Sequence, residues 1–75
     1  MSDSILNAKG LVCPLPVLRA RKAMKDLAPG SVLEILATDP GTRLDVPNFC
    51  EASGHELLEI REEDGTLVFR IRKKD

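Results

Sequence analysis

The sequence has few aromatic residues and few cysteines. Its 75 residues include two phenylalanines, two cysteines and one histidine, with no tryptophan or tyrosine, and the net charge is −1. Proteins that bind nucleic acid usually present a basic face, often with aromatic side chains on which bases stack. We therefore expect no direct contact with nucleic acid.

Long hydrophobic runs are also missing. No apolar run approaches the roughly 20 residues that cross a bilayer, and the first ten residues, MSDSILNAKG, have neither the basic region nor the apolar core of a secretory signal. We expect a cytoplasmic protein that makes no membrane contact. Because cytosolic thiols are kept reduced, the two cysteines should serve packing or thiol chemistry and not a structural disulfide.

The composition indicates one small soluble domain. Hydrophobic residues make up 43% of the chain and charged residues 31%, and a chain of this length buries only a thin core. We expect a single domain over residues 1–75, too small to enclose a deep active site.

The strand signals come from β-branched and other apolar residues between turn residues. Asp64-Gly65 separates the last two apolar runs, as in a tight hairpin. The expected strands cover residues 4–9, 31–38, 55–61 and 66–73.

Two further segments have the spacing of amphipathic helices. In the first, the helical spacing of apolar residues starts at residue 17, Pro14 or Pro16 can open the helix, and Pro29-Gly30 ends it. The second begins at residue 42 or 45 and ends before Gly54. The resulting order, β-α-β-α-β-β, predicts an α+β fold: a two-layer α/β sandwich in which both helices pack on one face of a four-stranded mixed sheet.

Cys13 stands between the first strand and the first helix, in the stretch GLVCPLPVLR. The positive end of a helix dipole stabilises a thiolate, so we expect the Cys13 pKa to lie below the free value of about 8.5. Pro14 and Pro16 fix their own backbone and push Cys13 and Leu15 toward extended geometry, which holds the thiol out from the helix. These features predict an exposed, nucleophilic thiol presented to other proteins.

The first helix is rich in cations. Near a helix start, positive charges oppose the dipole, which suggests a use outside the helix: to stabilise an anionic sulfur or to bind an acidic partner. An ordinary solvated face explains any one of them equally well. The candidate partner-binding cations are Arg19, Arg21, Lys22 and Lys25.

The other polar and sulfur-containing residues have simpler interpretations. Cys50 is expected in the core, and His55 at a turn or strand start. Asp39 and Asp45 stand at helix-cap positions, although Asp39 is also a candidate for partner contact. Cys13, Cys50 and His55 lack the paired spacings of zinc sites, so we expect no metal.

Four segments together resemble the TusA/SirA family of small sulfur-carrier proteins, over essentially the whole chain. They are LVCPLP (11–16), DP (39–40), DVPNFC (45–50) and GHEL (54–57).

The resemblance implies the sandwich seen in the C-terminal domain of translation initiation factor three, and a persulfide carried on Cys13. It implies a sulfur carrier or sulfurtransferase without a cofactor, loaded by a cysteine desulfurase or rhodanese-like donor. A DsrE/TusD-like acceptor protein would take the sulfur for tRNA thiolation, molybdenum-cofactor supply or sulfur oxidation. Arg21, Lys25 and Asp39 match partner-facing positions of the tRNA-thiolation branch, and Leu15 occupies a position where some members carry Glu.

Two other functions remain open from the residues alone. One is a non-catalytic interaction or regulatory module in which CPLP is only a rigid turn. The other is a redox thiol that forms a Cys13–Cys50 disulfide. We expect a monomer.

Overall fold

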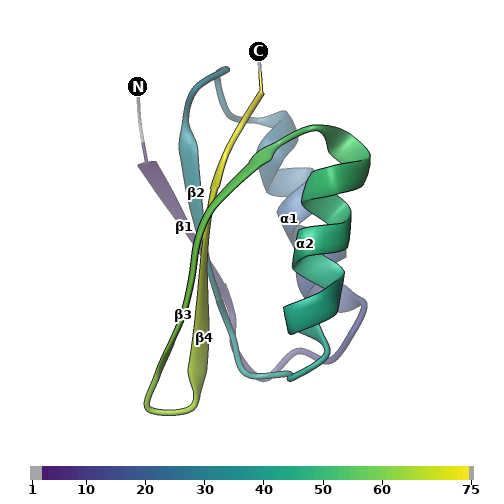
Figure 1. The fold of residues 1–75 in the computed structure, drawn as a ribbon, viewed down its shortest axis with the longest axis vertical. Helices are drawn as coiled ribbons and strands as arrows, with labels where there is room; N and C mark the ends of the chain where they lie inside the picture. The colour runs from purple at the N-terminus through teal and green to yellow at the C-terminus, as the bar shows by residue number, and fades with distance from the viewer. Residues whose placement is uncertain (1–2, 75) are drawn as a thin grey trace.

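The computed structural model describes residues 3–74 and contains four strands and two helices (Figure 1). The elements are β1 (Asp3–Ala8), α1 (Leu15–Lys25), β2 (Val32–Ala37), α2 (Thr42–Ser53), β3 (Glu56–Glu63) and β4 (Thr66–Arg72). The predicted element order is confirmed.

The strands form one sheet in the order β1-β2-β4-β3. β1 and β2 are parallel, and β4 is antiparallel to both of its neighbours, β2 and β3. A parallel pair needs a long crossover, which α1 supplies. Both helices cover the same face of the sheet (Figure 1), so the predicted two-layer sandwich is confirmed.

The core lies between this face and the helices. Alternate residues of the two interior strands point into it, as the period of two in a strand requires. The buried residues of β2 and β4 on this face are Leu33, Ile35, Ala37, Leu67, Phe69 and Ile71, and the helices contribute Ala20, Met24, Val46, Phe49 and Cys50.

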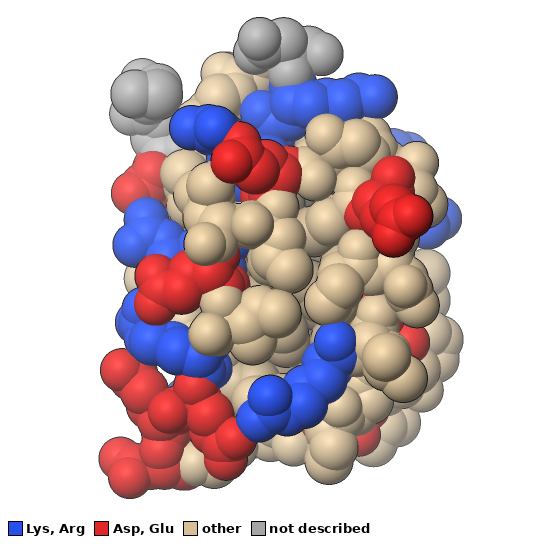
Figure 2. All heavy atoms as spheres, in the orientation of Figure 1, with Lys and Arg blue, Asp and Glu red and all other residues tan. Residues whose placement is uncertain are grey.

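The turn between β3 and β4 is tighter than expected, because β3 continues to Glu63. Asp64 (φ 50°) and Gly65 (φ 80°) alone connect the strands, and successive positive φ values characterise the hairpin turn that Asp-Gly favours. Figure 2 shows acidic side chains gathered toward this end of the hairpin.

α1 is shorter at its end than the sequence predicted. It stops at Lys25, where the N–H groups of Asp26 and Leu27 donate to carbonyls three residues back, over 3.1 and 3.2 Å. These bonds close the helix before Ala28, the residue that Pro29 disfavours in helical geometry.

α2 begins at Thr42, the earlier of the two expected starts, and Pro47 therefore lies inside it. Gly41 precedes the helix, and neither expected aspartate caps it with a side-chain hydrogen bond. The cap prediction for Asp39 and Asp45 is wrong because both carboxylates bond to Cys13 instead.

Among residues 3–74, no helix is long and apolar enough to span a membrane.

Candidate functional site

The loops that follow β1 and β2 lie together at one end of the molecule (Figure 1), because parallel strands end at the same edge of a sheet. Two hydrogen bonds join them: Gly10 N–H donates to Thr38 Oγ1 over 2.9 Å, and Cys13 N–H donates to Asp39 Oδ2 over 2.8 Å. A Cβ at Gly41 would lie 3.2 Å from Asp39 Oδ2 and 3.5 Å from Cys13 Cβ. The small residue therefore lets the Cys13 loop approach the start of α2.

Cys13 itself is an exposed free thiol, as predicted. It lies just ahead of α1, which begins at Leu15 with Pro16 in its first turn. The Leu18 N–H donates to the Pro14 carbonyl over 3.1 Å, so the first helical bond starts directly after the cysteine. The two prolines thus stand where the sequence indicated, at the start of the helix.

The side chain of Cys13 contacts Asp45 on α2: the thiol donates to Asp45 Oδ2. This hydrogen bond raises the pKa of Cys13, and slight desolvation and the negative charges of Asp45 and Asp39 raise it further. Loss of the proton would break the bond and place a thiolate beside two carboxylates. The predicted lowering of the Cys13 pKa by the helix dipole is therefore wrong for the free chain.

Sequence reasoning missed Asp45 as a neighbour of the thiol. The two residues are 32 positions apart, and the local pattern around Asp45 is that of an ordinary helix start. The order of the elements did contain a signal, because each of the first two expected strands is followed by a loop and then by a helix. The parallel pairing of β1 with β2 brings the starts of both helices to the same edge of the sheet.

Cys13 lies at one end of a groove between the two helices. The part next to the thiol has a volume of about 310 Å³ and includes Val17, Asp45 and Asn48 in its walls. Arg21, Phe49 and Ala52 line this part and also a second hollow of about 350 Å³. We call the two hollows together the interhelix groove.

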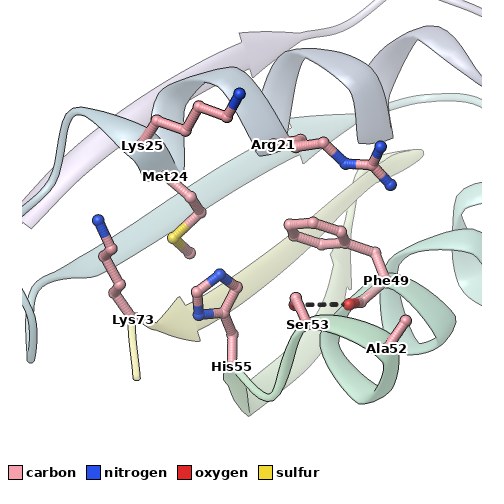
Figure 3. A pocket seen from close by; sticks show the side chains of 8 residues that line it. All are labelled: Arg21, Met24, Lys25, Phe49, Ala52, Ser53, His55 and Lys73. Atoms are coloured by element: carbon pink, nitrogen blue, oxygen red, sulfur yellow. Dashed lines mark hydrogen bonds between the residues drawn. The ribbon is translucent and has the colours of Figure 1, made fainter. Parts of the chain in front are cut away.

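The second hollow has an apolar floor and a basic rim (Figure 3). Arg21 lies over the Phe49 ring, with 5.9 Å between Cζ and the ring centroid. Lys25 and Lys73 also line the hollow, and none of the acidic residues between positions 3 and 74 does. The interhelix groove thus passes from a carboxylate beside the thiol to a cluster of cations.

The structure divides the four candidate cations of α1. Arg21 and Lys25 line the interhelix groove, whereas Arg19 and Lys22 line a hollow with Leu15 and Leu18. Three large apolar side chains within five residues of Cys13 in the sequence are exposed, and only Leu15 was singled out from the sequence. They are Val12 at 64%, Leu15 at 41% and Leu18 at 49%. Exposed apolar side chains beside a reactive group are typical of a protein-binding surface.

Cys50 is buried and free, as predicted for a core residue. Desolvation raises the pKa of its thiol to about 11, which leaves it inert near neutral pH. Both cysteines are free thiols in this structure. Residues 3–74 contain no group of three or more His, Cys, Asp or Glu side chains arranged to hold a metal ion.

His55 lies at the far end of the interhelix groove from Cys13, directly before β3. Its Nδ1 accepts the Lys74 N–H over 3.1 Å, and its ring centroid is 5.8 Å from that of Phe49. Burial and the charges of Lys73 and Lys74 lower the pKa of His55. The histidine is therefore a turn residue, as expected, and it takes no part in the thiol site.

Comparisons with known proteins agree on one family. The family model described as Sulfurtransferase TusA matches residues 4–73. Two proteins named Sulfur carrier protein TusA are among the similar sequences. The one from Pseudomonas aeruginosa (strain LESB58) is 54% identical over 96% of this chain and 91% of its own length. The one from Pseudomonas putida (strain GB-1) is 49% identical over 96% and 90%.

A solved structure has the same fold. The crystal structure of a SirA-like protein from Desulfitobacterium hafniense superposes with a TM-score of 0.85 at 31% sequence identity. The match covers 96% of this chain and 99% of that one.

Proposed function

This chain belongs to the TusA/SirA family, and from that premise we propose that it is a sulfur carrier in which Cys13 accepts sulfane sulfur as a persulfide and passes it to an acceptor protein. The observation that carries the proposal is the exposure of the Cys13 thiol at the mouth of the interhelix groove. The other thiol, Cys50, is buried and has a raised pKa, so it is a poor alternative carrier. The carrier domain spans residues 1–75 and works in the cytoplasm.

The transfer moves one neutral sulfur atom. The Cys13 sulfur attacks the terminal sulfur of a donor persulfide, a new S–S bond forms, and the donor S–S bond breaks. Cys13–SH and R–S–SH become Cys13–S–SH and R–SH, so no oxidant, reductant or cofactor is consumed. The second transfer repeats the same exchange with the thiol of the acceptor.

The partners are proteins, because the surface around the thiol suits protein contact. Val12, Leu15 and Leu18 supply exposed apolar area, and Arg21 and Lys25 supply positive charge nearby. We propose a cysteine desulfurase or rhodanese-like donor and a DsrE/TusD-like acceptor. The sulfur would serve tRNA thiolation, molybdenum-cofactor supply or sulfur oxidation.

Mass spectrometry of the intact chain tests the carrier function. After incubation with a cysteine desulfurase, pyridoxal phosphate and cysteine, the chain should gain about 32 Da for each sulfur atom, and a thiol reductant should remove the added mass. Cys13→Ser should abolish the gain, and the matched variant Cys50→Ala should retain it. A wild-type chain that never gains this mass, or a gain that follows Cys50, would contradict the proposal. The first result would favour a non-catalytic interaction module.

A further inference from the structure

Building on the proposed carrier function, we infer that Asp45 is a positioning residue that holds Cys13 as a neutral thiol in the free carrier, and that the sulfur donor frees the thiolate by placing a cationic side chain beside Asp45. Asp45 would thus keep the site inactive between partners, a role beyond the helix cap that the sequence suggested for it.

The geometry fixes both halves of the contact. The Asp45 backbone is held in the first turn of α2, where its N–H donates to the Gly41 carbonyl over 3.1 Å. The Cys13 backbone is held by Asp39, whose Oδ2 accepts the Cys13 N–H. With both backbones anchored, the thiol donates its single proton to Asp45 Oδ2 and the sulfur is turned toward α2.

The charges that face the thiol come from three elements. Asp39 from the loop after β2 and Asp45 from α2 act on it directly, and Arg21 from α1 lines the same hollow. Arg21 lies over the Phe49 ring, and within residues 3–74 neither Asp39 nor Asp45 forms a salt bridge. The two carboxylates therefore have no counter-ion of their own, and a thiolate between them would be repelled.

A donor with a lysine, arginine or protonated histidine at its contact surface changes this balance. Its cation would form a charge-assisted hydrogen bond with Asp45, which competes with the thiol for the same oxygen. Cys13 then loses its hydrogen bond to Asp45 and the repulsion from that carboxylate together. The thiolate attacks the terminal sulfur of the donor persulfide, its former proton passes to the departing donor thiolate, and atoms and charge balance.

Such an arrangement protects the empty carrier. Alkylation and oxidation both proceed through the thiolate, so an exposed cysteine that stays protonated reacts slowly with small electrophiles and oxidants. The same cysteine becomes reactive only where a persulfide donor is bound. Exposure and low intrinsic reactivity are thereby compatible in one residue.

The first measurement is the rate of alkylation of the free chain by iodoacetamide as a function of pH, in wild type, Asp45→Asn and Asp26→Asn. Asp26→Asn is the matched control, since it removes the same charge beyond the far end of α1. Near pH 7.5 we expect Asp45→Asn to react about threefold faster or more, because the fraction of thiolate rises, and its pH profile to move to lower pH. The control should follow wild type. An unchanged profile for Asp45→Asn, with an unchanged thermal melt to show that it folds, overturns the inference.

The second measurement is the single-turnover rate at which a cysteine desulfurase loads each variant with sulfur. If Asp45 receives the donor's cation, Asp45→Asn should load no faster than wild type despite its higher alkylation rate. If the loading rate of Asp45→Asn rises in proportion to its alkylation rate, the proposed contact between Asp45 and a cation of the donor is overturned, because Asp45 would then only suppress the thiolate. A wild-type chain that is never loaded contradicts the proposed function instead, and the alkylation profile still decides whether Asp45 holds the thiol.

Discussion

Phe49 forms the floor of the interhelix groove, and its replacement should destabilise the chain in a way that depends on Arg21. The ring is 6% exposed, with the His55 ring on one side and the Arg21 guanidinium over its face. Complete truncation to alanine costs about 3–5 kcal/mol in protein cores. A chain this small is expected near the lower end of the ~5–15 kcal/mol range for folded domains, so Phe49→Ala should unfold in part.

Phe49→Leu is the more useful change because it keeps most of the volume. Swaps of this kind cost about 1.5 kcal/mol or less, and the loss of the ring also removes the contact with Arg21, worth ~0.5–1 kcal/mol at an exposed site. We expect a total loss of ~1–2 kcal/mol and, since 1 kcal/mol shifts the Tm of a small domain by ~4–8 °C, a Tm lower by about 5–15 °C.

Urea unfolding of wild type, Phe49→Leu, Arg21→Gln and the double variant separates the two contributions. The coupling free energy between the two changes should be about 0.5 kcal/mol or slightly more. A parallel cycle of Arg21→Gln with Phe69→Leu should give no coupling, because Phe69 is fully buried on β4 and does not stack on Arg21. Equal coupling in both cycles, or a Phe49→Leu variant as stable as wild type, would refute the packing described for the groove.

Two further predictions concern pH. The folded Cys50 pKa is raised from 9.0 to about 11, so burial of the neutral thiol stabilises the fold below pH 9 and this contribution is lost as pH rises toward 11. At 1.36 kcal/mol per pKa unit the loss is ~2–3 kcal/mol. Urea unfolding at a series of pH values should show this loss of stability in wild type and not in Cys50→Ala. A loss of the same size in both proteins would contradict the prediction. The only histidine, His55, should titrate below 6.5 by NMR, because burial, Lys73 and Lys74 disfavour its charged form. Lys73→Gln should raise that midpoint, and an unchanged midpoint would exclude the lysine as a cause. Because the pKa of His55 is lower in the folded chain than in the unfolded chain, the free energy of unfolding should fall as pH drops below about 6.5, where the unfolded chain binds the proton first.

Local sequence was sufficient for the elements and for the exposed thiol. Alternating apolar residues in 66–72, Asp64-Gly65 between two strands, and Gly54 after α2 each act through their own backbone or their nearest neighbours. The position of Cys13 ahead of α1 follows from Pro14 and Pro16 in the same way. Helix ends were less well predicted, since Pro29 acts on the residue before it and the helix had already ended at Lys25.

The direction in which the pKa of the Cys13 thiol is shifted could not be predicted from local sequence. From the sequence, the nearest influence on Cys13 was the dipole of α1, which favours a thiolate. In the folded chain the parallel pairing of β1 with β2 brings the start of α2 to the same edge, and Asp39 and Asp45 reach the cysteine from 26 and 32 residues away. A hydrogen bond and two nearby negative charges act over a few ångströms and outweigh a partial charge at a helix end. The sequence by itself therefore determined that a thiol is presented at a helix start, and only the tertiary structure decided that the pKa of this thiol is raised and not lowered.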